Sequence, residues 1–161
     1  MVYGGAKVGL MGRLAEAVLE RKGEIIGVIP RSLFEKEVAF TGLTDLRVVD
    51  SMHERKALMA ELADGFIALP GGFGTVEEFF EVATWAQLGL HTKPCGLLNV
   101  HHYFDRLLEF MDHTVSERFV EPEHRAMILV DDEPERLLGQ FETYQPPKVD
   151  KAKWALGFKK D

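Results

Sequence analysis

The sequence predicts an α/β fold, with a parallel β-sheet covered by helices on both faces. The first observation behind this prediction is that short apolar runs alternate with amphipathic segments along the chain, as in consecutive βαβ units. The second is that each run is nearly continuous in Val, Ile, Leu or Phe, which is typical of strands buried on both faces. The third is that glycine clusters follow two of the runs, where strands turn into helices.

Five apolar runs are the expected strands, and one further extended segment is a weaker candidate. The five runs cover residues 1–3, 24–29, 65–69, 95–100 and 126–130, and the weaker candidate covers residues 46–49. The first run begins at Met1 and is shorter than a usual strand of about five or six residues. We therefore expect that a segment is missing before Met1.

Amphipathic patterns between the runs predict five helices. They cover residues 10–22, 52–63, 76–88, 103–118 and 133–144. Gly23 and Gly89 stand where a glycine commonly ends a helix, so we predict that they stop the first and third helices. Asp132 is the predicted N-cap of the last helix, with Pro134 in its first turn.

Length and composition limit the kind of protein this can be. Of the 161 residues, we expect residues 1–145 to form a single domain and residues 146–161 to form a loosely held tail. The formal net charge of -7 leaves no broad basic face, so neither nucleic acid nor an anionic membrane is an expected partner. A lone cysteine, Cys95, excludes an internal disulfide, and no apolar run approaches the roughly 20 residues that span a bilayer. We expect a cytoplasmic protein.

Two glycine-rich loops connect predicted strands to predicted helices. In the first, residues 70–75 read Pro-Gly-Gly-Phe-Gly-Thr and follow the strand at residues 65–69. Glycines at such a turn let the backbone approach a ligand, and the N–H groups of the following helix attract an anion such as phosphate. Thr75 adds a hydroxyl donor to this loop. A second cluster, at residues 4–9, offers further backbone donors.

The two loops match no standard nucleotide fingerprint. Neither G-x-x-x-x-G-K-[ST] nor G-x-G-x-x-G occurs in the chain, which disfavours kinase, ATPase and NAD-binding functions. A pair of tight turns without a ligand is the alternative, but two strand-to-helix glycine loops in one small domain favour binding. The histidines show no ligand spacing, so we predict no metal site, and Cys95 is expected in the core.

Glu77 and Glu78 lie just after Thr75, where carboxylates have two possible roles. The segment reads as an S/T-x-x-E capping box, in which Thr75 is the N-cap and Glu78 bonds back to its amide. Alternatively, Glu78 faces a sugar or water beside the bound phosphate and needs a cationic partner. Arg55 is the best candidate for that partner, because it lies at the edge of an apolar helix face and its guanidinium can fork onto a phosphate or carboxylate.

Two motifs are specific in combination. They are P-G-G-x-G-T-x-x-E at residues 70–78 and M-H-x-R-K at residues 52–56, and V-Y-G-G at residues 2–5 with G-L-M-G at residues 9–12 accompanies them. Together they resemble the LOG family, the cytokinin riboside 5'-monophosphate phosphoribohydrolases, which are often labelled possible lysine decarboxylases. The likeness also covers residues 26–30, 84–89 and 93–99, and so runs over nearly the whole chain.

The resemblance implies a Rossmann-like, doubly wound fold in a homodimer or higher homo-oligomer. It implies hydrolysis of the N-glycosidic bond of AMP or an N6-substituted, cytokinin-type AMP, which releases the base and ribose 5-phosphate and uses neither cofactor nor metal. By motif position, Arg55 and Glu78 would be the catalytic pair. Arg55 would hold the phosphate or the ribose hydroxyls, or keep Glu78 ionised. The implied substrate-binding residues are Gly4, Gly5, Met52, Lys56, Gly71, Gly72, Gly74 and Thr75.

Two alternative functions and one departure accompany this resemblance. A non-catalytic nucleotide or molybdenum-cofactor carrier is similar in fold but lacks the Arg55 and Glu78 pair. A pyridoxal decarboxylase needs a Schiff-base lysine, and no lysine here has a setting that singles it out; for Lys56, spacing alone indicates a solvated side chain. LOG-like proteins have a strand, a Gly-Ser-Ser-type loop and a helix before the V-Y-G-G strand, and we expect this N-terminal strand and helix to be missing here.

Overall fold

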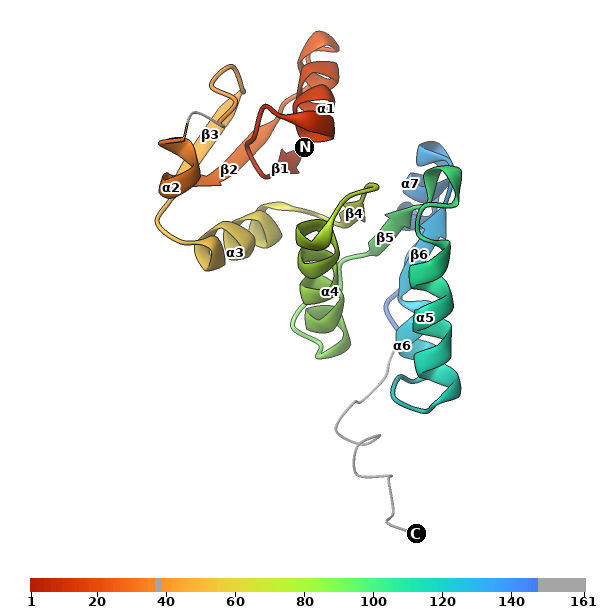
Figure 1. Cartoon of the computed structure of the whole chain (residues 1–161). Helices are drawn as coiled ribbons and strands as arrows, with labels where there is room; N and C mark the ends of the chain where they lie inside the picture. Colours follow the sequence, from red (N-terminus) through yellow and green to blue (C-terminus); the bar gives the residue numbers. More distant parts are fainter. Residues whose placement is uncertain (37–38, 148–161) are drawn as a thin grey trace. The chain divides into compact units, whose positions relative to one another are not determined.

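The computed structural model describes residues 1–36 and 39–147. The chain forms two compact units, Met1–Ala63 and Asp64–Asp161, and each has its own three-stranded sheet (Figure 1). Every pair of neighbouring strands in the described residues is parallel. All-parallel sheets flanked by helices confirm the predicted α/β class and are consistent with a Rossmann-like, doubly wound fold. Residues 148–161 of the predicted tail lie outside the described residues, and the single-domain boundary at residue 145 stays a prediction.

The first unit has the strand order β1-β2-β3. Val2 of β1 pairs with Ile26 of β2, and Pro30 at the end of β2 pairs with Val49 of β3. The unit contains β1 (Val2–Tyr3), α1 (Gly9–Glu20), β2 (Ile26–Pro30), α2 (Arg31–Phe34), β3 (Asp45–Val49) and α3 (Met52–Leu62). Its core joins the sheet to α1 through the buried residues Tyr3, Ala15 and Ile25.

The second unit has the strand order β4-β5-β6. Phe66 pairs with Cys95 across the first two strands, and Leu98 pairs with Asp131 across the last two. The unit contains β4 (Phe66–Ala68), α4 (Phe73–Gln87), β5 (Cys95–Leu98), the short 3-10 helix η1 (Val100–His102), α5 (Asp105–Ser116), α6 (Pro122–Ala126), β6 (Ile128–Asp131) and α7 (Pro134–Glu142).

The core of the second unit is apolar and contains the lone cysteine. Cys95 packs with Ala68, Phe79, Leu97 and Phe104, all of them buried. Burial raises the pKa of the Cys95 thiol from its usual 9.0 to about 12, because a thiolate would lose its hydration there. The prediction that Cys95 is a core residue is confirmed.

All the predicted strands are present, with ends that differ by a few residues. At the last strand, Ala126 is the final residue of α6 and not the predicted first residue of the strand, which begins at Ile128. The sequence did not predict α2 or α6, because four or five residues are too few to show a helical period.

Of the two glycines predicted to end helices, one is confirmed. Gly89 follows α4 with a positive φ of 75°, and its N–H donates to the Ala86 carbonyl at 2.9 Å, so it ends the helix as predicted. After α1 the left-handed residue is Lys22, with φ of 58°, and not Gly23. Gly23 instead lies so close to Val18 that a Cβ would be 2.9 Å from a methyl carbon of that side chain, and its N–H donates to the Val18 carbonyl.

The N-cap predicted for the last helix is off by one residue. Glu133, and not Asp132, caps α7, while Pro134 occupies the first turn as predicted. The Glu133 N–H donates to Asp131 Oδ1 at 3.0 Å, so an acidic side chain two residues earlier accepts the bond.

Within residues 1–36 and 39–147, no helix combines the length and the apolar character needed to cross a bilayer.

Candidate functional site

The glycine loop after β4 leads directly into the N-terminus of a helix. β4 ends at Ala68, and α4 begins at Phe73 with Gly72 as its N-cap. The first intrahelical bond runs from Val76 N to the Gly72 carbonyl at 3.2 Å, so the preceding amides have no acceptor within the helix. Gly72, Phe73 and Gly74 are exposed. These amides and the helix dipole make an accessible place for an anion.

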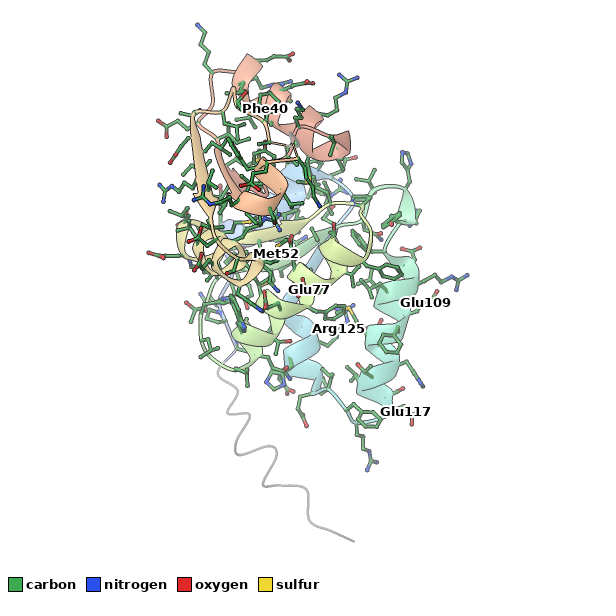
Figure 2. The ribbon with its side chains drawn as sticks, turned by 60° about the vertical axis from the view of Figure 1, so that its left-hand side comes forward. Phe40, Met52, Glu77, Glu109, Glu117 and Arg125 are labelled. Carbon is green, nitrogen blue, oxygen red and sulfur yellow. The ribbon has the colours of Figure 1, made fainter. Side chains whose placement is uncertain are left out.

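The capping-box interpretation of Thr75 is wrong. Thr75 is inside α4, because the helix begins at Phe73 and Gly72 occupies the N-cap position without a side-chain cap. Glu78 comes nearly one turn after Thr75 and is half-buried, whereas the neighbouring Glu77 is exposed (Figure 2). Since Thr75 is not the N-cap, the catalytic role implied for Glu78 no longer competes with a capping box.

Gly71 is enclosed from two directions. A side chain at this position would overlap Thr75 Oγ1, so only a glycine lets the loop backbone approach that hydroxyl so closely. The Gly71 carbonyl accepts a hydrogen bond of 2.7 Å from the hydroxyl of Tyr103, which lies between β5 and α5. Nothing in the sequence singles out Tyr103, because no local spacing signals a contact between residues 32 positions apart.

In the first unit, the guanidinium of Arg55 is held in a fixed orientation. Arg55 is the one buried residue of α3 in the structure. Its Nε donates to the Val28 carbonyl in β2 at 3.1 Å, and its Nη1 lies 3.2 Å from Met52 Sδ. Ser51 caps the helix by accepting a bond from the Glu54 N–H at 3.1 Å, which sets the start of the turn that presents Arg55.

Gly4 lies against the same guanidinium. A Cβ built on Gly4 would overlap Arg55 Nη2 and would lie 3.1 Å from both Arg55 Cζ and Met11 Cε. Gly5 is also buried and has a positive φ of 74°. The glycines after β1 therefore let the backbone and the arginine share a space that larger residues would fill.

The second predicted glycine loop, at residues 4–9, also lies between a strand and a helix. It follows β1 and ends where α1 begins at Gly9, whose N-cap Val8 provides no side-chain acceptor. The Gly5 carbonyl accepts a bond of 2.8 Å from the Phe40 N–H, which ties the loop to the segment before β3. The predicted position of this loop is confirmed.

The predicted site residues fall into one group in each unit. Met52 begins α3 and is exposed (Figure 2), and Lys56, next to Arg55, is half-buried. The first unit holds Gly4, Gly5, Met52, Arg55 and Lys56, and the second holds Gly71, Gly72, Gly74, Thr75 and Glu78. The catalytic pairing of Arg55 with Glu78 joins residues of both units and stays a prediction. In the described part of the chain, no three His, Cys, Asp or Glu side chains are grouped to hold a metal ion.

Comparison with known proteins supplies the family. Residues 11–141 match the family described as "Possible lysine decarboxylase". The chain is 57% identical over 131 residues to the cytokinin riboside 5'-monophosphate phosphoribohydrolase of Rhodococcoides fascians, covering 81% of this chain and 66% of that protein. It is 51% identical over 146 residues to a probable enzyme of the same name from Oryza sativa subsp. japonica, covering 91% of this chain and 64% of that protein. It is 48% identical over 146 residues to a cytokinin riboside 5'-monophosphate phosphoribohydrolase of Arabidopsis thaliana, covering 91% of this chain and 67% of that protein. The chain therefore spans less than two thirds of the length of the first two curated relatives.

Proposed function

We propose that the protein is a nucleoside 5'-monophosphate phosphoribohydrolase. The reason is that this chain belongs to the possible lysine decarboxylase family, or LOG family. Its substrate would be AMP or an N6-substituted, cytokinin-type AMP. Hydrolysis of the N-glycosidic bond would give the free base and ribose 5-phosphate. The support comes from relatives that carry this activity in their names at 48 to 57% identity.

The observation that carries the proposal is the open N-terminus of α4. Gly72 caps this helix without a side-chain bond, and the exposed residues Phe73 and Gly74 follow. A nucleotide's 5'-phosphate can accept hydrogen bonds from these amides and is attracted by the positive end of the helix dipole. An uncharged nucleoside has no phosphate that the helix dipole could attract, so the proposal favours monophosphates as substrates.

Glu78 is proposed to act on the sugar. Cleavage of the bond between the ribose carbon and the base nitrogen builds positive charge on the ring, as in other glycosyl transfers. A carboxylate one turn into α4 stabilises that charge and can orient or deprotonate the attacking water. This role requires Glu78 to be ionised at the working pH.

Arg55 is proposed as the catalytic partner of Glu78, with three possible tasks. Its Nε is committed to the Val28 carbonyl, which fixes the plane of the guanidinium. A fixed, planar fork can bind the phosphate, bind the ribose hydroxyls or keep Glu78 ionised. The three tasks differ in their kinetic signature, because loss of substrate binding raises KM while loss of an interaction specific to the transition state lowers kcat.

The deciding experiment is an assay of base release. The purified protein is incubated with AMP and, separately, with isopentenyladenosine monophosphate, and the free base is quantified by chromatography. Release from one substrate at a higher kcat/KM would establish both the activity and the preferred base. Binding of both nucleotides without release would identify a non-catalytic carrier instead.

We also propose that the protein works as a homodimer or larger homo-oligomer. Phe110 on α5 and Phe119 just after it are 59% and 76% exposed, so both present apolar rings that a second copy of the chain could cover. Phe110 also lines a cavity of about 220 Å³ beside Phe80, Met111 and His124. Light scattering on the purified chain tests this assembly.

We further propose a cytoplasmic location, where nucleoside monophosphates are available. Cell fractionation tests this location.

A further inference from the structure

We propose that Tyr103 is a positioning residue that holds the glycine loop of residues 70–75 ready to bind a phosphate. The inference rests on the proposed function, because that function assigns phosphate binding to the loop. Tyr103 follows β5, and the loop follows β4, the strand paired with β5. The Tyr103 hydroxyl crosses between these two connections and donates to the Gly71 carbonyl at 2.7 Å.

This hydrogen bond sets the direction of an amide at the N-terminus of α4. The Gly71 carbonyl and the Gly72 N–H belong to one trans peptide group, which is planar, so the two bonds point in opposite directions. Fixing the Gly71 oxygen therefore fixes the Gly72 N–H, which stands at the N-cap of α4. A side chain on Gly71 would overlap Thr75 Oγ1, so the first turn of α4 also confines this residue.

The connection that carries Tyr103 is held by a buried amide. Asn99, which follows β5, is 9% exposed. Its Oδ1 accepts a bond of 2.7 Å from the Phe104 N–H, and its Nδ2 donates to Asp105 Oδ1 at 2.8 Å. The Asn99 N–H donates to the Asp131 carbonyl of β6 at 2.7 Å. The side chain of Asn99 thus closes the connection on both sides of Tyr103 and ties it to the sheet.

The backbone before Tyr103 adopts a conformation that most residues avoid. His101 and His102 have φ of 52° and 59°, in the left-handed region that non-glycine residues rarely occupy. Two such residues in succession persist only where the surroundings hold them, and this is common where a chain positions a functional group. The Tyr103 ring then packs edge-on against the buried Phe104, with ring centres 5.1 Å apart and planes at 88°. Ring and backbone together aim the hydroxyl at the loop.

The same hydrogen bond adds little to stability, which makes its role testable. Tyr103 is 54% exposed, so water can replace either partner when the bond is lost. Tyr103→Phe removes only the oxygen and keeps the ring contact with Phe104. Tyr144→Phe is the matched control, because it removes the same group from the second unit at a position outside the loop and its contacts.

The kinetic test compares the two variants with the wild-type chain. For Tyr103→Phe we expect KM for the nucleoside monophosphate to rise by about 3- to 10-fold with kcat within about twofold, as for a lost hydrogen bond that acts on ground-state binding. Affinity for ribose 5-phosphate should fall by the same factor, while affinity for adenine should not change. Tyr144→Phe should match the wild type in all three measurements. An equal loss of affinity for adenine, or a fall in kcat at constant KM, would overturn the proposal.

A second measurement needs no substrate and so separates this inference from the proposed function. Hydrogen–deuterium exchange of a peptide spanning residues 70–76 should be faster in ligand-free Tyr103→Phe than in the wild type and in Tyr144→Phe. Unchanged exchange in this peptide would overturn the positioning role even if the wild type releases base. Faster exchange in a protein that releases no base would support the positioning role and reject the phosphoribohydrolase function.

Discussion

The guanidinium of Arg55 occupies the space that a side chain at Gly4 would fill. A Cβ on Gly4 would overlap Nη2 and lie 3.1 Å from Cζ, while Nε of the same arginine donates to the Val28 carbonyl. The arginine is therefore confined by β2 on one side and by the loop after β1 on the other. Its orientation depends on the absence of a side chain at a residue far away in the sequence.

We predict that Gly4→Ala will damage activity more than folding. The added methyl group must displace the guanidinium, and a displacement of about 1 Å at a catalytic group can cost about 100-fold in kcat/KM. Overpacking should lower the free energy of unfolding by about 1–3 kcal/mol. Base release and urea unfolding measure the two effects.

Gly139→Ala is the matched control for this substitution. Gly139 lies in α7, and a Cβ there would have no neighbour within 4 Å. The variant should keep wild-type activity and gain about 0.5–1 kcal/mol of stability, because alanine favours the helix. A fully active Gly4→Ala protein would contradict the role given to Arg55's orientation.

We predict that Glu78→Gln will lower kcat by about 100- to 1000-fold, the usual cost of removing one preorganised electrostatic group. The amide has the same shape but cannot stabilise positive charge on the ribose or accept a proton from water. Glu77→Gln, on the exposed neighbour, should keep normal turnover. Both are measured by base release at saturating substrate, and near-normal turnover of Glu78→Gln would remove Glu78 from the mechanism.

We predict that Arg55→Lys will lower both activity and stability although the charge is kept. A lysine cannot donate to the Val28 carbonyl and present a planar fork at the same time. Loss of this charged hydrogen bond should cost about 1.5–3 kcal/mol in the free energy of unfolding. Kinetics will show which task Arg55 has: a raised KM indicates substrate binding, and a lowered kcat indicates an effect on the transition state or Glu78.

The control for Arg55→Lys is a lysine at an exposed position. Arg106 on α5 has a side chain 90% exposed and pairs with Glu109 at 2.7 Å. Arg106→Lys should leave both kinetics and unfolding unchanged, because exposed ion pairs are screened by water. Unchanged kinetics and unfolding in Arg55→Lys would show that the buried hydrogen bond to the Val28 carbonyl contributes to neither activity nor stability.

We predict that part of the protein's alkaline unfolding comes from Cys95. Its pKa is about 12 in the folded state against 9.0 ordinarily, so the unfolded chain releases this proton first. Stability from the neutral thiol is therefore complete below pH 9 and falls as the pH rises from 9 towards 12. Between pH 9 and pH 10 the loss should be about 1 kcal/mol.

The measurement is the pH dependence of the unfolding free energy for the wild type and Cys95→Ala. The variant is expected to be less stable at pH 8 but to lose less stability between pH 9 and pH 10. The comparison isolates the thiol, because Tyr3 and Tyr144, whose pKa values burial also raises, are present in both proteins. Parallel curves for the two proteins would show that Cys95 does not contribute.

Local chemistry was readable from the sequence by itself. The strands, the longer helices and both strand-to-helix glycine loops follow from hydrophobic period and from residues such as Gly89, whose effects depend on near neighbours in the chain. The motifs at residues 52–56 and 70–78 pointed to the family for the same reason, since their residues are contiguous. The sequence-based prediction was wrong at the N-cap of α4. Thr75 is a common N-cap residue type, but the backbone places Gly72 at that position.

Only the tertiary structure decided which distant residues touch. The contact of Arg55 in α3 with Gly4 after β1 joins residues far apart in the sequence, and so does the hydrogen bond from Tyr103 after β5 to Gly71 after β4. Such contacts depend on strand order and register, which bring the ends of paired strands together regardless of their separation in sequence. Periodicity reports the face that a residue shows, but the partner on that face exists only after the sheet has assembled.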